Sequence, residues 1–410
     1  MNEIFHVDYC YRRRLLSIFS IMDGRIVYIS LSDETVREEK KGEDFSIPSL
    51  YTLAGNSSFV LAFPCNDFNL CGMVAIYKNA KGKICRDYAQ PVLSRHMKKA
   101  GVKAVVVSGV ASKLSYLYMS DDNIGVYHCE NIRFCSPYRF AAVLLSSPDD
   151  GFIAIGEAGE KLSPLSICCC DSGITTGRGG LASLMGKMNF KGIISHTVLE
   201  DDEKLQYAIR RKNRTALMSD MSLYGSAVLL DYGASYGWAP KNEFSPYYDP
   251  RLKALDGRSQ SREYRVEKSG CPLCPVPCSL VDTATQMRLP SWMEAMCLGS
   301  NLGIFSTGKV TRLLHQCLSL GLDPCAAGEM LSFLNTLDNP DYTIPGVKNT
   351  SLDEKCRILT LIASRKGAGE IVSGGFDALA GAPSIDGGAC IYDLRGAHAQ
   401  SLFSVYGENT

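Results

Sequence analysis

The chain has no excess of charge of either sign and no long apolar run. Lysine plus arginine and aspartate plus glutamate number 43 each in 410 residues, so the formal net charge is zero. A balanced chain offers no general field to attract nucleic acid or an acidic membrane surface. No apolar run approaches the ~18 residues of a membrane span, and the N-terminus, MNEIFHVDYCYRRRLL, lacks the order of a secretion signal. We therefore expect no nucleic acid and no membrane among its partners.

Several common catalytic signatures are also missing. The six histidines show no paired spacing such as H-x-x-x-H, which would place two imidazoles on one face of a helix. There is no G-x-S-x-G elbow for a nucleophilic serine, and no pair of carboxylates has a spacing typical of acid–base work. The catalytic residues are therefore unknown from motifs alone.

Cysteine, in contrast, is abundant. The 17 cysteines are odd in number and spread along the whole chain. A secreted disulfide scaffold is short and has an even number, so reduced thiols in the cytoplasm explain this usage better. Three of them, Cys168, Cys169 and Cys170, are consecutive. Neighbouring strand residues point to opposite faces, so this run is more typical of a buried strand than of a metal site.

The pattern of apolar residues changes along the chain. Short β-rich runs fall at 57–63, 71–79, 104–111 and 141–147, whereas helical spacing appears at 205–217, 309–323 and 351–369. Gly321 is predicted to end the second helix, and Ser351 with Glu354 forms a capping box at the start of the third. We expect an α+β fold, in which a β-rich domain of residues 1–197 precedes a mainly helical domain of residues 198–410.

The stretch SGCPLCPVPCSLVD contains the most informative spacing. Cys271, Cys274 and Cys278 form a C-x2-C-x3-C triplet in a proline-rich segment that cannot be regular helix. Three thiolates on such a loop can converge on an iron–sulfur cluster or on zinc. Zinc would want a fourth cysteine or histidine nearby, and none follows within the next fifteen residues. The triplet therefore favours a [4Fe–4S] cluster, with zinc, or no metal, as the alternatives.

A second candidate is the glycine-rich turn Gly177-Arg178-Gly179-Gly180, which leads into a helix-like segment. Backbone amides at such a turn can face an anion, and Arg178 adds a bidentate donor for phosphate. The spacing matches neither the dinucleotide fingerprint nor the P-loop. A tight turn that packs a helix against a sheet is an equally good interpretation of the glycines alone.

Several colinear segments resemble the aldehyde ferredoxin oxidoreductase family of tungsten- or molybdenum-pterin enzymes. They extend from about residue 60 to the C-terminus and comprise AIGEAGEKLSPLSIC, TTGRGGLASLMGKMNFKGI, YGSAVLLDYGASYGWAPKNEF, CPLCPVPC, WMEAMCLGSNLGI, the GLD of LSLGLD, IASRKGAGEIVSGG and YDLRGAHAQSLFSV.

The resemblance implies an oxidoreductase that acts on aldehydes. Its fold would be a base domain of two β-sheets followed by helical domains. A tungsten or molybdenum bis-pterin would sit on the base and contact Gly177, Arg178, Gly179 and Gly180 as well as Gly321, Leu322 and Asp323. Electrons would pass through a [4Fe–4S] cluster on the cysteine triplet to ferredoxin or another carrier. Cys297, Cys317, Cys325 and Cys390 are candidates for the fourth cluster ligand, with Cys325 favoured because it follows the GLD element.

The chain also departs from the family pattern. Met73, Tyr88 and Ile385 stand where the family has arginine, asparagine and lysine, and Leu318 stands where it has an aspartate. We expect that the family's final domain is missing or truncated in this chain, and that another subunit would complete the site. The alternative is a diverged, pterin-deficient and catalytically inactive relative that acts in electron transfer or binding.

Overall fold

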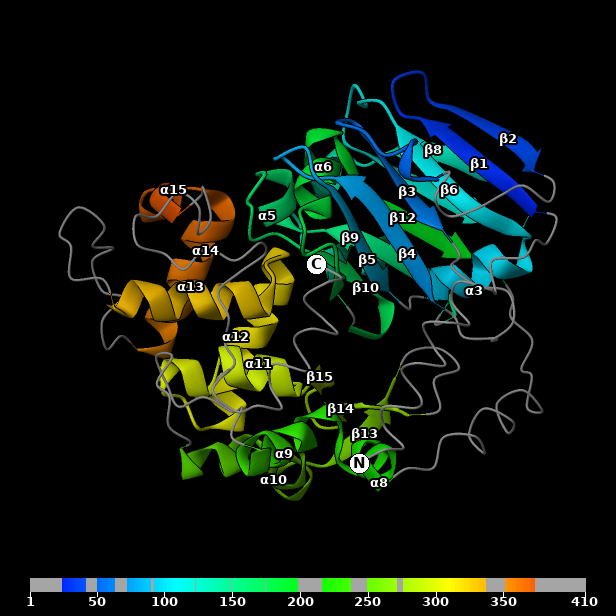
Figure 1. Ribbon diagram of the computed structural model, residues 1–410. Helices are drawn as coiled ribbons and strands as arrows, with labels where there is room; N and C mark the ends of the chain where they lie inside the picture. Colours follow the sequence, from blue (N-terminus) through cyan, green and yellow to red (C-terminus); the bar gives the residue numbers. More distant parts are fainter. Residues whose placement is uncertain are drawn as a thin grey trace.

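The structure is a computed structural model. It describes residues 24–41, 50–62, 72–89, 92–121, 123–147, 149–173, 175–197, 216–236, 249–270, 276–336 and 351–372. Figure 1 shows two β-sheets at the upper right and helices to the left of and below them. This order of β-rich and helical parts confirms the predicted fold class.

The first sheet has six strands in the order β2-β1-β6-β3-β4-β5. β1 runs parallel to β6, and the other neighbours are antiparallel. The central strands are rich in valine, isoleucine and alanine and are buried along almost their whole length. The bounds are β1 Gly24–Ser30, β2 Thr35–Lys41, β3 Ser58–Ala62, β4 Met73–Lys78, β5 Ile84–Ala89 and β6 Val102–Ser108.

The second sheet also has six strands, in the order β11-β10-β9-β12-β7-β8. Its bounds are β7 Ser115–Ser120, β8 Ile124–His128, β9 Gly151–Ile155, β10 Cys168–Cys170, β11 Thr175–Thr176 and β12 Phe190–His196. The cysteine run is fully buried, as predicted. Cys168 and Cys170 face the core of the β-rich part, whereas Cys169 faces the helical core.

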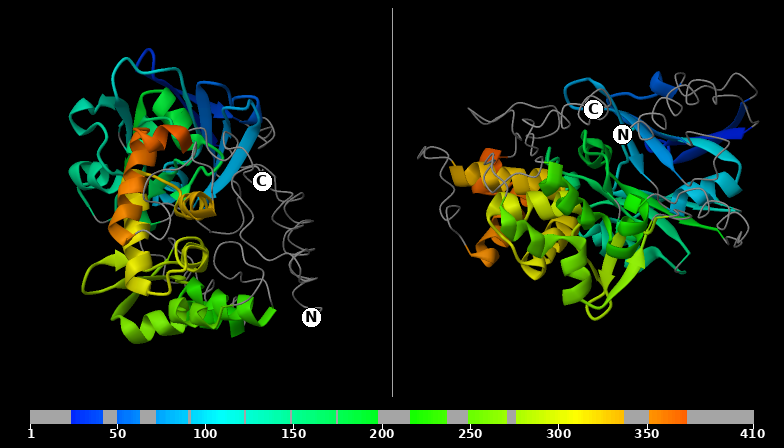
Figure 2. Two further views of the ribbon diagram at one scale, coloured as in Figure 1. Left: turned by 90° about the vertical axis from the view of Figure 1, so that its left-hand side faces the viewer. Right: turned by 60° about the horizontal axis from the view of Figure 1, so that its bottom comes forward.

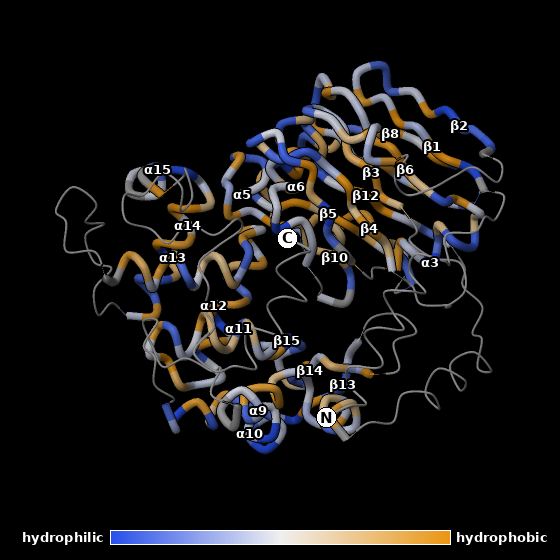
Figure 3. The backbone as a smooth tube through the Cα atoms, in the orientation of Figure 1, coloured by the Kyte–Doolittle hydropathy of each residue, from blue (hydrophilic) through white to orange (hydrophobic). Residues whose placement is uncertain are grey.

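The two sheets pack face to face around one apolar core. Phe59 of β3 and Phe190 of β12 meet across it with their ring centroids 5.9 Å apart. The sheets also approach at both edges, where β2 contacts β8 and β5 contacts β11. The helices α3 (Val92–Lys99) and α6 (Leu181–Lys187) add apolar side chains to the same core. Figure 3 shows that apolar residues are concentrated in the strands of the two sheets.

The remaining elements are mainly helical. Their bounds are α4 Pro137–Leu144, α5 Glu157–Glu160, α8 Ala216–Tyr224, α9 Leu229–Tyr236, α10 Gly257–Glu263, α11 Trp292–Cys297, α12 Thr307–Leu320, α13 Pro324–Thr336, α14 Leu352–Ser364 and α15 Ala368–Ile371. Short 3-10 turns are η1 Glu130–Ile132, η2 Asp171–Gly173, η3 Ser226–Val228, η4 Pro250–Leu255 and η5 Ser300–Leu302. A small sheet consists of β13 Val266–Ser269, β14 Ser279–Asp282 and β15 Met287–Arg288.

The helix ends follow the local sequence signals. α12 ends at Gly321, which has a left-handed φ of 71°, and the side chain of Ser351 accepts a hydrogen bond from the amide of Glu354 at the start of α14. The predicted helix stop at Gly321 is confirmed, and of the predicted capping box the structure shows the hydrogen bond to the Ser351 side chain. α14 itself ends at Ser364, with Arg365 in the left-handed conformation.

One predicted strand is wrong. The run at 141–147 lies largely in the helix α4. Ser136 caps this helix by accepting a hydrogen bond from the amide of Arg139, and Pro137 occupies its first turn. A serine cap followed by proline starts a helix, and this local signal outweighs the β-branched content of the run.

The helical part docks on the β-rich part through α12 and α14, which contact α4 and α5 respectively. Figure 2 shows the two parts in contact in both further views. No helix within the described ranges is both long and apolar enough to cross a membrane.

Candidate cofactor-binding site

The cysteine triplet falls in the loop of a β-hairpin. Strands β13 and β14 pair antiparallel, with Val266 opposite Asp282 and Ser269 opposite Ser279, so the hairpin closes around residues 270–278. A Cβ on Gly270 would lie 2.9 Å from the Cα of Pro277, so the two ends of the loop touch. Cys271 and Cys274 lie outside the described residues. Cys278 is half-buried immediately before β14.

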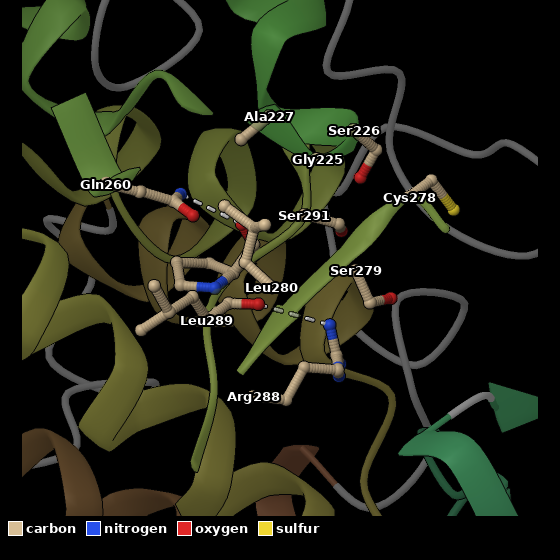
Figure 4. A pocket seen from close by; sticks show the side chains of 11 residues that line it. Gly225, Ser226, Ala227, Gln260, Cys278, Ser279, Leu280, Arg288, Leu289 and Ser291 are labelled. Carbon is tan, nitrogen blue, oxygen red and sulfur yellow. Dashed lines mark hydrogen bonds between the residues drawn. The ribbon is translucent and has the colours of Figure 1, made fainter. Parts of the chain in front are cut away.

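A small hollow of about 10 Å³, enough for about one water molecule, lies beside Cys278. Figure 4 shows the thiol at the edge of the hollow with its sulfur pointing away from the centre. The amide of Ser226 donates a 2.6 Å hydrogen bond to the Cys278 carbonyl oxygen, which fastens this end of the loop to η3. The end of the hairpin that carries Cys278 is thus held in place by η3.

Behind the hollow lies a buried ion pair. Arg288 of β15 donates to both carboxylate oxygens of Glu294, at 2.7 and 2.6 Å. The Arg288 carbonyl oxygen also lies 3.0 Å from Nε2 of His315 on α12. These contacts tie the small sheet to α11 and α12, so the cysteine hairpin rests on a rigid support.

The glycine-rich turn has an unusual backbone. Gly177 and Gly180 have φ values of +88° and +113°, which favour glycine. A Cβ on Gly179 would lie 2.5 Å from the hydroxyl of Tyr77 and 3.1 Å from Cys85, so the turn packs closely on β4 and β5. Among the described residues, a Cβ on Gly180 would meet Asn79 alone, at 3.9 Å, so within this part of the chain that side of the turn is open.

Arg178 projects from this turn to the GLD element of the helical part. Its Nε atom lies 2.5 Å from Oδ2 of Asp323, and its Nη2 donates to Oδ1 at 3.1 Å. The carboxylate raises the pKa of Arg178 above its usual value. The structure therefore brings together two motifs that the sequence singled out separately.

A second carboxylate faces the same turn. Asp87 of β5 accepts a hydrogen bond from the backbone amide of Gly179 and another from the hydroxyl of Tyr77. Burial raises the pKa of Asp87, and the Asp323 charge raises it further, whereas the charge of Arg178 and these hydrogen bonds lower it. Sequence motifs did not identify Asp87 or Tyr77. The available signal was an aspartate on the inward-facing register of a strand, alternating with Cys85 and Ala89.

The GLD element is fixed by the backbone of the β-rich part. The amide of Ile167 donates to the Gly321 carbonyl at 2.8 Å, and the amide of Asp323 donates to the Leu165 carbonyl at 2.8 Å. Leu322 between them is fully buried. A Cβ on Gly156 would lie 2.5 Å from the Leu320 carbonyl oxygen, so glycine allows this close approach. The GLD element and Gly156 thus also serve the packing of the helical part against the β-rich part.

The candidate fourth cluster ligands are mostly core residues. Cys297, Cys317 and Cys325 are all buried, and Cys390 lies outside the described residues. Burial, and then a hydrogen bond to the Cys325 thiol, raise the pKa of Cys297. In the described part of the chain, no three side chains of histidine, cysteine, aspartate or glutamate gather closely enough to hold a metal ion. The choice of Cys325 stays a prediction.

Two family models match most of the chain. The model described as "Aldehyde ferredoxin oxidoreductase, N-terminal domain" matches residues 70–197. The model described as "Aldehyde ferredoxin oxidoreductase, domains 2 & 3" matches residues 203–393.

Individual proteins agree with these models. A tungsten-containing aldehyde ferredoxin oxidoreductase of Pyrococcus furiosus is 29% identical over 251 residues, which are 58% of this chain and 42% of the relative. The same organism has an aliphatic sulfonate oxidoreductase, WOR-like subunit, that is 21% identical over 328 residues, 69% of this chain and 51% of the relative. The chain therefore spans about half the length of these curated relatives.

A solved structure shares the fold. It is the active site complex BamBC of benzoyl coenzyme A reductase with 1,5-dienoyl-CoA, and its chain superposes with a TM-score of 0.70 at 13% identity. The match covers 90% of this chain and 66% of that one. The fold is a two-sheet base followed by a helical body, and the family models agree with the sequence motifs. The chain belongs to the aldehyde ferredoxin oxidoreductase family.

Proposed function

We propose that the protein oxidises an aldehyde at a tungsten or molybdenum bis-pterin and passes the electrons through a [4Fe–4S] cluster to ferredoxin or another carrier. The observation that carries the proposal is the meeting of the glycine-rich turn and the GLD element at the Arg178–Asp323 pair. These two motifs contact the pterin in the family pattern. The abundant cysteines are in keeping with work in the reducing cytoplasm.

The cluster would be held by Cys271, Cys274 and Cys278. A hairpin loop whose ends touch at Gly270 and Pro277 restricts the span over which the three thiols can lie. Thiolates are the ligands that iron–sulfur clusters use, so the chemistry of the donor set fits this group. The cluster would supply one-electron transfer between the site and the carrier.

The pterin would lie against the open side of the glycine-rich turn. Arg178 has 41% of its side chain exposed and is the cation available for an anionic group there. Gly180 has open space where a Cβ would be, so a ligand can approach the backbone closely. The remaining predicted contacts, Gly177, Gly179, Gly321 and Leu322, would shape this surface through the backbone.

A second polypeptide is part of the proposal. The described residues offer few cations to balance the phosphates of two pterins, because Met73 replaces an arginine of the family and is fully buried in the core. A subunit that supplies further donors would complete the pocket. Within this chain, residues 1–197 would form the base domain and residues 198–410 the helical domain that carries the cluster.

Metal analysis of anaerobically purified protein tests this function. We expect iron at cluster stoichiometry and tungsten or molybdenum in the wild-type preparation, and loss of iron in Cys274→Ser. Cys356→Ser is the matched control, because Cys356 is a half-buried thiol of α14, away from the triplet. Stoichiometric zinc without iron would contradict the cluster, and iron without tungsten or molybdenum would contradict the pterin.

A further inference from the structure

Three charged side chains from three separate segments meet at the glycine-rich turn. Asp87 comes from β5, the edge strand of the first sheet nearest the helices (Figure 1). Arg178 comes from the turn itself, and Asp323 comes from the residue before α13. Arg178 pairs directly with Asp323, and its charge also acts on Asp87. None of the sequence motifs predicts that these three side chains lie together.

The charges of this cluster do not balance when all three groups are ionised. Two carboxylates then share one guanidinium, which leaves one net negative charge in a partly buried place. Asp323 cannot easily be the neutral member, because it pairs with Arg178 and also accepts a 2.9 Å hydrogen bond from the amide of Cys325. The side-chain hydrogen bond that Asp87 accepts comes from the phenol of Tyr77, which carries no charge. A proton on Asp87 brings the cluster to neutrality.

We propose that Asp87 is a proton-holding residue of this site, so that an anionic ligand binds beside Arg178 together with a proton on Asp87. The inference rests on the proposed function for the anion and on the cluster geometry for the proton. In its ionised form, Asp87 occupies the Gly179 amide and opposes a second anion next to Arg178. In its neutral form, it leaves Arg178 balanced by Asp323 alone.

Among the described residues, the titratable groups that face Asp87 act on its pKa in both directions. Tyr77 of β4 is buried, and burial raises its pKa above the usual value, so it stays a neutral donor. Cys168 of β10 is fully buried, and burial raises its pKa as well. Arg178 lowers the pKa of Asp87, whereas burial and Asp323 raise it. The resulting direction is upward, so Asp87 takes up a proton at a higher pH than an exposed aspartate does.

The first test needs no cofactor. Infrared difference spectra of the full chain, recorded while the pH is lowered, should show a protonated carboxyl C=O band that appears above the pH range of exposed aspartates. Burial also raises the pKa of Asp171, to about 7, so the Asp87 band is the component that Asp87→Asn removes and Asp171→Asn keeps. Asp33→Asn should leave it unchanged, because Asp33 is an exposed carboxylate in the turn between β1 and β2. Tyr77→Phe keeps the carboxyl and removes its donor, so it should move the band to still higher pH.

The second test measures the ligand. Tungsten or molybdenum and pterin retained by the holoprotein after dialysis should fall as the pH rises, with affinity weakening about tenfold per pH unit above the Asp87 pKa. Asp87→Asn should make retention independent of pH over this range. Asp33→Asn should behave like the wild type.

The outcomes separate the inference from the proposed function. If Asp87→Asn removes no component of the spectrum, or removes one only in the ordinary aspartate range, the inference is overturned whatever the protein binds. Retention with the same pH dependence in wild type and Asp87→Asn overturns the proton linkage. If neither metal nor pterin is retained at any pH while the Asp87 band behaves as expected, the proposed function fails and the protonated carboxyl stands.

Discussion

Arg178 and Asp323 form an ion pair that joins the two halves of the molecule, with Nε and Oδ2 2.5 Å apart. The pair is asymmetric, because 41% of the Arg178 side chain is exposed whereas only 3% of the Asp323 side chain is. Asp323 also receives the amide of Cys325. The buried member is thus the carboxylate, and its charge depends on the arginine for compensation.

This asymmetry predicts unequal costs for removing the two partners. Arg178→Ala would leave a buried carboxylate unpaired and should lower the free energy of unfolding by about 2 kcal/mol, a figure reduced for the exposure of the arginine. Asp323→Asn should cost less, because the exposed guanidinium can turn to water and the amide oxygen can still accept from Cys325. Urea denaturation measures both values.

The control for this prediction is the pair of Arg312 and Asp353, whose side chains are both mostly exposed. Arg312→Ala should change the stability by less than about 1 kcal/mol. If Arg178→Ala and Asp323→Asn lower the free energy of unfolding by the same amount, the burial of the carboxylate does not determine how much stability is lost. A double variant Arg178→Ala/Asp323→Asn should recover part of the loss of Arg178→Ala.

A second prediction concerns the contact between the two halves at Gly156. Gly156→Ala would place a Cβ 2.5 Å from the Leu320 carbonyl oxygen and 2.7 Å from the Gly321 amide nitrogen, both of them backbone atoms. We expect a loss of about 3 kcal/mol, because neither backbone can move without separating the GLD element from Leu165 and Ile167. Thermal unfolding followed by calorimetry measures it.

Gly101→Ala is the matched control for this glycine. Its φ of +66° is strained for alanine, but no atom of the described residues lies within 4 Å of the added Cβ. It should cost about 1 kcal/mol from backbone strain alone. A loss in Gly156→Ala no larger than this would mean that the two halves separate easily at this point.

The sequence predicted the fold class and the capped helices because these depend on local signals. Ser351 and Gly321 act within a few residues of where they stand, and the three consecutive cysteines carry their own strand geometry. The glycine-rich turn singled out Arg178 and the family resemblance singled out Asp323, each within its own segment. Nothing local could place them together, because their contact spans 145 residues and depends on how the halves dock.

Asp87, in contrast, is a site residue that no sequence motif identified. Its chemistry comes from Tyr77 on the next strand and from Gly179 far along the chain, not from its neighbours in sequence. The wrong strand at 141–147 has a simpler cause. The serine and proline just before this run, Ser136 and Pro137, start a helix that continues into it. The sequence predicts where individual helices begin and end, because these signals are local. It does not predict which charged side chains from distant segments lie together.

A third prediction concerns acid stability. His96 of α3 is only 3% exposed, and its Nδ1 lies 2.8 Å from the hydroxyl of Ser195. Burial lowers the pKa of His96 to about 4. The unfolded chain, with a histidine pKa of about 6.5, takes up this proton first, so acid favours unfolding. The contribution of His96 to stability should fall as the pH drops from about 6.5 to about 4, by at most about 3 kcal/mol.

The measurement is urea denaturation of the wild type and His96→Gln at a series of pH values. The difference between the two curves isolates His96 from the other titrating groups, and the acid slope of the wild type should be steeper. His128→Gln is the control, because the His128 side chain is 40% exposed. Parallel pH curves for wild type and His96→Gln would show that His96 is charged or solvated in the folded protein.

The fourth prediction concerns the ion pair of Lys191 and Glu160, whose side chains are 0% and 1% exposed. Lys191 also donates to the Cys135 carbonyl at 2.9 Å, and Glu160 accepts from the amide of Phe134 at 3.1 Å. Lys191→Met would leave a carboxylate buried without a cation, at a cost of about 3 to 5 kcal/mol. Denaturant titration measures this loss against Lys366→Met, an exposed lysine that should change little.

The double variant Lys191→Met/Glu160→Gln decides why the pair matters. If the cost of Lys191→Met comes from the uncompensated carboxylate, removing that charge as well should recover most of the lost stability. If it comes from the lost packing and the lost bond to the Cys135 carbonyl, the double variant should be at least as unstable as Lys191→Met. Because Glu160 also closes the motif segment that contains Gly156 and Gly159, recovery of stability with an intact Arg178–Asp323 contact would show that the charge pair fastens α5 independently of the cofactor site.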